Sequence, residues 1–175
     1  MKKPIVAALL SVPVCAFAHD YSYLDGGMVD GDGPRGAQSD LGVRLSGSAE
    51  IAAPVALFGE IVDTDEFTHL SGGAMFHTPL QYGLELNAGG SIEHVDYGRA
   101  DDTGLGVRAG VRWWVPNTHN RLEINPELRH LYVFDGPSTS VRNNVLYRVT
   151  ANLDLQGALQ FGDDDRAEVG MRYEF

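Results

Sequence analysis

The feature that most constrains this chain is a strict alternation of apolar and polar residues. Between Leu41 and Ile51 every odd position is apolar or glycine, while the even positions carry Gly, Arg, Ser and Glu. The same alternation recurs over residues 82–92, 105–115 and 166–175. Successive side chains of a strand point to opposite faces, so a period of two residues predicts β-strands that are apolar on one face only.

Runs of this kind divide most of the chain after its first twenty residues. We expect about ten strands, with eight as the alternative, near residues 21–29, 40–51, 55–63, 67–77, 81–96, 103–115, 121–134, 142–151, 155–162 and 166–175. Four short connections with turn-forming residues alternate with five connections rich in Asp and Gly, near residues 30–39, 64–66, 98–102, 135–140 and 163–165. This order predicts an all-β fold of antiparallel strands whose two termini share the end that holds the short turns.

The length of the strands and the charges on their polar face indicate a membrane-spanning barrel. A strand of about 10 residues, tilted by about 40°, rises roughly 25 Å, which is the height of the apolar band on an outer-membrane barrel. Arginine and glutamate occur together on the polar face, and no lysine follows Lys3. A closed lumen explains this pairing, because buried charges need partners and Arg binds carboxylates through two hydrogen bonds. The alternative is a soluble two-sheet sandwich with a solvated polar face.

By parity we expect a lumenal ion-pair network in the side-chain-filled interior of a closed antiparallel transmembrane barrel. Its predicted members are Arg44, Glu50, Glu60, Glu85, Glu93, Arg108, Arg112, Glu123, Glu127, Arg129, Arg148, Glu168, Arg172 and Glu174. Arg121 and Arg166 are placed on the same face. Small barrels have interiors just wide enough for side chains to fill, so we expect a packed interior rather than an open channel.

The first residues read as an export signal. Lys2 and Lys3 precede an apolar stretch over residues 5–18, which ends in the small-x-small sequence Ala16-Phe17-Ala18. This pattern predicts a cleavable signal peptide over residues 1–18, removed before His19, and an outer-membrane barrel domain over residues 19–175. Cys15 is the only cysteine, so neither a disulfide nor a zinc site of several cysteines is expected.

The last residues, 169–175, carry a resemblance to known proteins. The run Val-Gly-Met-Arg-Tyr-Glu-Phe resembles the closing strand of Gram-negative outer-membrane barrels of the OmpA or opacity type. The resemblance implies a location in the outer membrane and contact with its lipid and lipopolysaccharide. It also implies that the barrel-assembly machinery reads this strand through four alternating residues, Val169, Met171, Tyr173 and Phe175.

A closer resemblance is to a group of small acidic barrels, some of them labelled sulfation-dependent quorum factors. It is carried by the opening run Tyr-Ser-Tyr-Leu-Asp-Gly-Gly at residues 21–27 and by Gly-Leu-Gly-Val-Arg at residues 104–108, followed by Ala-Gly-Val-Arg at 109–112. The quorum label concerns a processed peptide and does not follow from a barrel. This chain departs from the pattern at Pro126, where a bulge or a missing ladder bond is expected.

The histidines are the main candidates for catalysis or metal binding. They are His69, His77, His94, His119 and His130, and only His94 has a carboxylate, Asp96, at i+2 on the same face. Ser91 and His94 differ in parity, so they should point to opposite faces and cannot form a nucleophile–base pair. We therefore expect no enzyme, no catalytic residue and no cofactor.

The charge balance excludes some partners. The formal net charge is −11, and phosphate binding needs clustered Lys and Arg, so nucleic acid is not an expected partner. The aspartates gather in one set of connections, where solvation of the rim is the simplest interpretation. A sharper hypothesis is that weakly bound Ca²⁺ or Mg²⁺ bridges these carboxylates to lipid phosphates.

The expected function is that of a non-enzymatic outer-membrane barrel with a filled lumen and a structural or surface-interaction role in the cell envelope. Two alternatives stay open, which are a narrow porin-like channel for ions or small solutes and an outer-membrane enzyme.

Overall fold

A computed structural model describes residues 21–32, 40–80 and 82–175. The predicted signal peptide, residues 1–18, lies outside the described residues. The described chain forms ten strands: β1 (Tyr23–Gly31), β2 (Asp40–Ala52), β3 (Val55–Thr64), β4 (Thr68–Pro79), β5 (Leu84–Asp96), β6 (Asp101–Trp114), β7 (Leu122–Val133), β8 (Gly136–Arg148), β9 (Leu153–Gly162) and β10 (Arg166–Glu174). Within these ranges no helix is long and apolar enough to cross a membrane.

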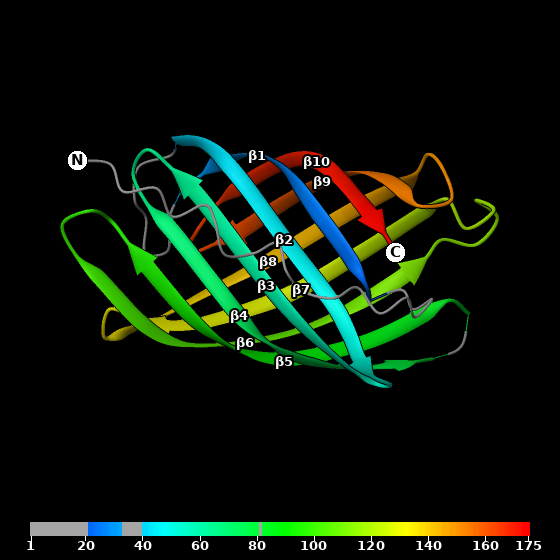
Figure 1. Ribbon diagram of the computed structural model, residues 1–175, viewed down its shortest axis with the longest axis horizontal. Coiled ribbons are helices and arrows are strands. Elements are labelled where there is room, and N and C mark those ends of the chain that lie inside the picture. Colours follow the sequence, from blue (N-terminus) through cyan, green and yellow to red (C-terminus); the bar gives the residue numbers. More distant parts are fainter. Residues whose placement is uncertain (1–20, 33–39, 81) are drawn as a thin grey trace.

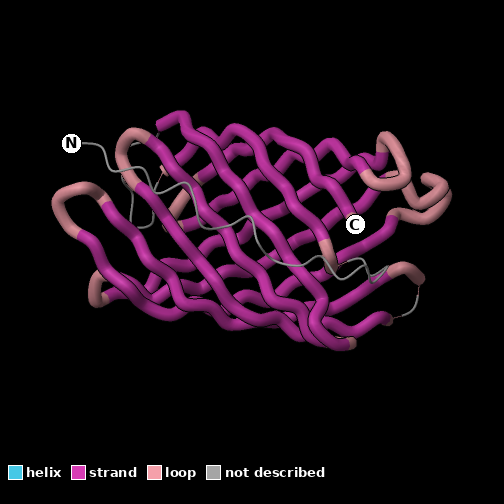
Figure 2. The backbone as a smooth tube through the Cα atoms, viewed as in Figure 1, coloured by secondary structure: helices cyan, strands magenta, loops and turns pink. Residues whose placement is uncertain are grey.

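The ten strands form one closed antiparallel barrel, as Figures 1 and 2 show. Each strand pairs with its neighbours in the sequence, and β1 closes the ring by pairing with β10, from Tyr23 opposite Glu174 to Gly31 opposite Arg166. Closure pairs every strand on both sides, which leaves no open sheet edge. The prediction of an all-β barrel with ten strands is confirmed, and the sandwich of two sheets is wrong.

The alternation places apolar side chains outside and polar side chains inside. On the outer face Leu105 and Val169 are 67% and 65% exposed, whereas Arg44 and Glu93 on the inner face are buried. A water-soluble fold buries its apolar face, but here the large aliphatic residues cover the outside. This continuous apolar exterior is suited to contact with the hydrocarbon of a bilayer.

The start of β8 differs from the sequence prediction. We expected an acidic connection over residues 135–140 and a strand from residue 142, but β8 begins at Gly136. Phe134 and Asp135 both have positive φ, 50° and 57°, and form a two-residue hairpin between β7 and β8. Such hairpins have positive φ at both central residues. The Asp-Gly pair at 135–136 indicates a turn of this kind, but the structure places it one residue earlier, with Gly136 already in β8. The expected long connection was therefore wrong.

The lengths of the connections do not distinguish the two ends of the barrel. At the end that holds the termini, the connections span residues 53–54, 80–83, 115–121 and 149–152. At the other end, which we name the acidic rim, they span residues 32–39, 65–67, 97–100, 134–135 and 163–165. The longest described connection, 115–121, is thus on the side where only short turns were expected. It contains Arg121, which is exposed rather than lumenal as parity had suggested.

Pro126 interrupts the ladder between β6 and β7. Paired residues run from Leu105–Tyr132 to Gly110–Glu127 and resume at Trp113–Ile124 in the same register, so two pairs are missing and no bulge is inserted. On its other side Pro126 pairs normally with Asn143 of β8. The expected lost bond is therefore confirmed, because proline has no N–H to donate to β6.

Replacing Pro126 by Ala should leave stability unchanged or raise the free energy of unfolding by up to about 1 kcal/mol, the net value of one hydrogen bond. The restored N–H can complete the ladder toward β6, and the side chain faces outward. Urea unfolding of the refolded barrel in detergent micelles, followed by tryptophan fluorescence, measures the difference. A loss of more than about 1 kcal/mol would instead show that proline stabilises this position by restricting the unfolded chain.

Two glycines inside the strands make room for a bulky neighbour. A Cβ atom on Gly73 of β4 would lie 2.8 Å from the Phe58 ring of β3, and one on Gly89 of β5 would lie 2.9 Å from Met75. Both distances are too short for carbon contacts. Glycine at these positions therefore leaves room for Phe58 and Met75, and also for the backbone carbonyl oxygens of Gly90 and Ala74, which would lie nearer still.

Candidate functional site in the barrel lumen

The centre of the lumen is crossed by ion pairs to Glu60 of β3. One carboxylate oxygen, Oε2, accepts a hydrogen bond from Arg44 Nε of β2 at 2.9 Å, and Oε1 accepts one from Arg129 Nη1 of β7 at 2.9 Å. In the ring order β3 and β7 are four strands apart. The contact between Glu60 and Arg129 therefore bridges the lumen rather than neighbouring strands. Glu60 is only 5% exposed.

Arg44 and Arg142 extend this belt around the wall. Arg44 Nη1 donates to Asp25 Oδ1 of β1 at 2.6 Å, and its Nε lies 3.6 Å from Glu168 of β10. Arg142 of β8 donates to both oxygens of Glu168 at 2.6 and 2.7 Å, which is the strong bidentate geometry. These contacts join the strands on both sides of the closing pair β1 and β10.

A second group of pairs lies toward the terminal end. Arg112 Nε and Nη2 donate to the two oxygens of Glu123 at 2.9 and 3.0 Å, and Arg148 contacts Asp154 at 3.2 Å and also pairs with Glu174. Tyr21, which precedes β1, lies under the Arg112 guanidinium, with 4.8 Å between Cζ and the ring centre. Burial raises the pKa of the Tyr21 hydroxyl, so this residue stays protonated.

Two histidines lie inside the barrel, each beside a glutamate. His69 Nε2 lies 2.8 Å from Glu93 Oε2, and Ser91 donates to the other oxygen of Glu93. His77 Nδ1 lies 2.7 Å from Glu85 Oε1, and its ring stacks on Tyr21 with 3.9 Å between ring centres. These contacts satisfy buried carboxylates, which is a packing role.

All members of the predicted network lie on the inner face, buried or half-buried. Glu50 lies 3.7 Å from His77, and Glu127 accepts a hydrogen bond from Arg129 at 2.6 Å. Parity did not identify six further charged or titratable partners in the lumen, Asp25, His69, His77, Arg142, Asp154 and Asp164. Asp154 was missed because it was assigned to a connection before the expected strand at 155–162. The Arg142 signal was present, because Arg142 shares the parity of Arg148 in the expected strand at 142–151. The Asp25 signal was also present, because its parity is opposite to that of the apolar Leu24 and Met28.

The acidic-rim end of the lumen is closed by apolar side chains. Val29, Val62 and Phe67 form a buried cluster against which Tyr97 packs. Tyr97 also lies 5.5 Å from the ring of Phe134, measured between ring centres. Beside this cluster Arg166 pairs with Asp164 at 2.9 Å. This rim is therefore sealed by a layer of rings and aliphatic groups over the charged belt.

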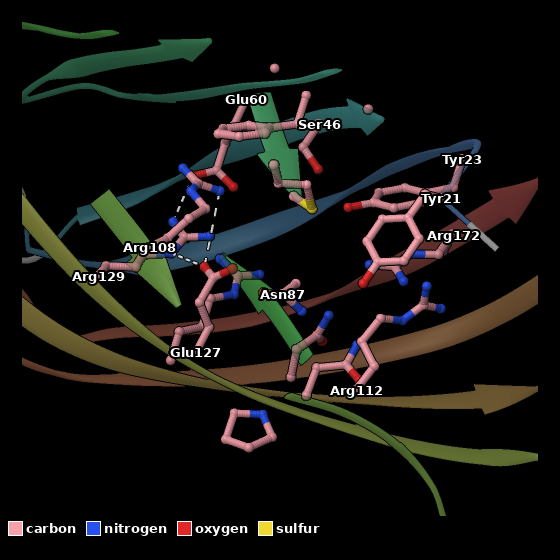
Figure 3. A pocket seen from close by; sticks show the side chains of 18 of the residues that line it. Tyr21, Tyr23, Ser46, Glu60, Asn87, Arg108, Arg112, Glu127, Arg129 and Arg172 are labelled. Carbon is pink, nitrogen blue, oxygen red and sulfur yellow. Dashed lines mark hydrogen bonds and ion pairs between the residues drawn. The ribbon is translucent and has the colours of Figure 1, made fainter. Parts of the chain in front are cut away.

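A cavity of about 80 Å³ lies within the lumen. Figure 3 shows Glu60, Arg108, Arg129 and Glu127 at one side of this space, and Tyr21, Tyr23, Arg112 and Arg172 at the other. On this measure a water molecule needs roughly 10–15 Å³, so the cavity has room for a few small molecules but not for a chain of solutes.

Two rim carboxylates accept hydrogen bonds from backbone N–H groups of neighbouring segments. Asp163 accepts a hydrogen bond from the Thr139 N–H at 2.7 Å, and Asp102 accepts one from the Phe134 N–H. Among residues 21–32, 40–80 and 82–175, no group of three or more His, Cys, Asp or Glu side chains is arranged to hold a metal ion. The binding of divalent cations at the rim stays a prediction.

The candidate catalytic residues are separated. Ser91 is buried in the lumen, whereas His94 lies on the outer face, where its Nδ1 is 2.9 Å from Thr103 Oγ1. The expectation that these two residues point to opposite faces is confirmed. No nucleophile–base pair is formed by them.

Several solved structures have a fold similar to that of this chain. The KdgM porin is 12% identical with a TM-score of 0.54, covering 87% of this chain and 99% of that porin. The NanC porin is 7% identical with a TM-score of 0.54, covering 87% and 100%. A further structure, the KdgM porin in complex with disordered oligogalacturonate, is 10% identical with a TM-score of 0.50, covering 89% and 98%.

No family model and no curated protein matches the chain. The resemblance to the small acidic barrels and the reading of β10 by the assembly machinery therefore stay predictions. The fold, by contrast, rests on three agreeing observations: a closed ring of ten strands, an apolar outer face and the likeness to solved porins. The chain therefore has the fold of solved outer-membrane porins, a closed antiparallel β-barrel with an apolar outer face.

Proposed function

We propose that this protein is a non-enzymatic structural barrel of the outer membrane whose lumen does not conduct. The observation that carries the proposal is the bridge from Arg44 through Glu60 to Arg129, which spans the lumen with hydrogen bonds of 2.9 Å. The apolar cluster at the acidic rim supports it, since it covers one mouth. Four of the five connections at this rim have two to four residues, which favours an envelope role over recognition by long loops.

In planar bilayers we expect the refolded barrel to show no steady single-channel steps in concentrated KCl. The triple variant Glu60→Gly/Phe67→Gly/Arg129→Gly removes the bridge and the largest buried ring of the rim cluster. It should open a measurable conductance, because both obstacles to a water-filled path are then gone. A heat-modifiable shift in gel electrophoresis verifies that each sample is folded. Regular conductance steps from the unmodified protein would overturn the proposal.

A narrow channel for ions or small solutes is the second candidate, favoured by the cavity lined with arginines at mid-lumen. The two candidates differ in one measurable property. A channel requires the bridge to open without mutation, so its conductance should be present in the unmodified barrel and depend on voltage or on a solute.

A further inference from the structure

The central cavity has an excess of positive charge in its lining. Two glutamates line it, Glu60 and Glu127. Six arginines line it as well, namely Arg44, Arg108, Arg112, Arg129, Arg142 and Arg172. Arg112, Arg142 and Arg172 have carboxylate partners that do not line the cavity, namely Glu123, Glu168 and Asp25. A cavity lined in this way is suited to a negatively charged occupant.

Arg108 differs from the other lining arginines in its contacts. Each of the other five donates at least one hydrogen bond of 3.2 Å or less to a carboxylate. Arg108 has its nearest carboxylates among the described residues at 3.9 Å, on Glu93, and at 4.0 Å, on Glu127. Both distances exceed a hydrogen bond. The residue is nevertheless only 9% exposed, with its guanidinium 4.0 Å from the centre of the Phe58 ring.

The neighbour of Arg108 explains this shortage of partners. Arg108 of β6 lies directly opposite Arg129 of β7, and both side chains point inward. Arg129 donates hydrogen bonds to Glu60 at 2.9 Å and to Glu127 at 2.6 Å. Both carboxylates are therefore already engaged. Like charges opposite each other on neighbouring strands destabilise a sheet. A guanidinium cannot relieve this by losing its proton, and it has five N–H donors to satisfy.

We propose that the cavity binds one small monovalent inorganic anion, of the size of chloride or nitrate, held by the guanidinium of Arg108. Such an anion would supply the missing acceptor and offset the repulsion between Arg108 and Arg129. Because Arg108 is the one lining arginine for which the described residues supply no hydrogen-bonded carboxylate, an anion with a single negative charge is enough to balance it. The volume of about 80 Å³ accommodates an ion with a few waters.

The test uses the mature protein refolded in detergent micelles and unfolded with urea. Sodium chloride is exchanged stepwise for sodium gluconate at constant ionic strength, because gluconate, a six-carbon carboxylate, is a much larger anion than chloride. The unfolding midpoint should rise with chloride concentration and then saturate, and nitrate should act in the same way. Arg108→Met keeps the contact with Phe58 and should lose this dependence, whereas the exposed control Arg121→Met should keep it.

Two results would overturn the proposal. One is a midpoint of the unmodified protein that does not respond to chloride at constant ionic strength, and the other is an unchanged response in Arg108→Met. A second measurement needs no variant: crystals grown in bromide should show an anomalous peak within hydrogen-bonding distance of the Arg108 guanidinium. A cavity that contains only water in saturating bromide would count equally against the site.

Discussion

Replacing Glu60 by Gln is expected to lower the free energy of unfolding by about 3–5 kcal/mol, the usual cost of breaking a buried ion pair by removing one partner. Gln keeps the volume of the side chain but removes the charge that both Arg44 and Arg129 share. Water cannot compensate this loss fully, because the site is nearly inaccessible. Urea unfolding in micelles, with the slope of the transition compared between proteins, gives the difference.

The matched control is Glu66→Gln, at an exposed glutamate in the connection between β3 and β4, which should change stability by less than about 0.5 kcal/mol. Removing both charges in Glu60→Gln/Arg129→Met should cost less than the sum of the two single variants, since the contact between Glu60 and Arg129 is then lost only once. A cost below about 1 kcal/mol for Glu60→Gln would mean that the bridge contributes little to the fold.

An arginine on the outer face should lower the free energy of unfolding more, the deeper it lies in the bilayer. Leu45→Arg, near the middle of β2, is expected to lower the free energy of unfolding by about 2–4 kcal/mol, whereas Ile51→Arg, near the end of the same strand, should cost about 0–1 kcal/mol. Both side chains are exposed on the outer face of the same strand. They differ in height in the bilayer, and Ile51 also lies at the register shift between Glu50 and Ala52, whereas Leu45 pairs regularly with Ile61.

The free energies of unfolding of the two arginine variants are measured in phospholipid vesicles, because detergent adapts to a charge more easily than a bilayer does. Leu45→Ala serves as the control for lost packing. Equal costs for the two arginine variants would mean that the outer face of β2 does not contact hydrocarbon at the height of Leu45.

Much of the architecture could be predicted because one rule governs every strand. Alternation over residues such as 41–51 requires a strand, fixes its two faces and places each arginine or glutamate inside or outside. The ends of the strands were harder to predict from the sequence, as β8 shows. The residues after Asp135 include Gly, Pro, Ser and Thr, whose composition is typical of loops, yet they continue the ladder because the turn is complete within two residues. Local turn geometry, not composition, decided that boundary.

The candidate site was predictable in its membership but not in its pairing. Parity assigns Glu60 and Arg129 to the lumen, but their contact joins residues 69 apart in sequence. It depends on the stagger of the strands around the ring, which alternation does not determine. The shortage of partners at Arg108 follows from the same stagger, because the β6–β7 register sets Arg108 opposite Arg129.

The belt across the lumen has a consequence for how the barrel enters a bilayer. Glu60 and Arg129 come within reach of each other only when the wall curves round. An incomplete sheet inserted into lipid would turn guanidinium and carboxylate groups toward acyl chains, at a cost of at least about 2.5 kcal/mol for each charge near the bilayer centre. Insertion strand by strand is therefore unfavourable. The chain has to cross as a nearly finished cylinder, or be sheltered by another protein until its first and last strands meet.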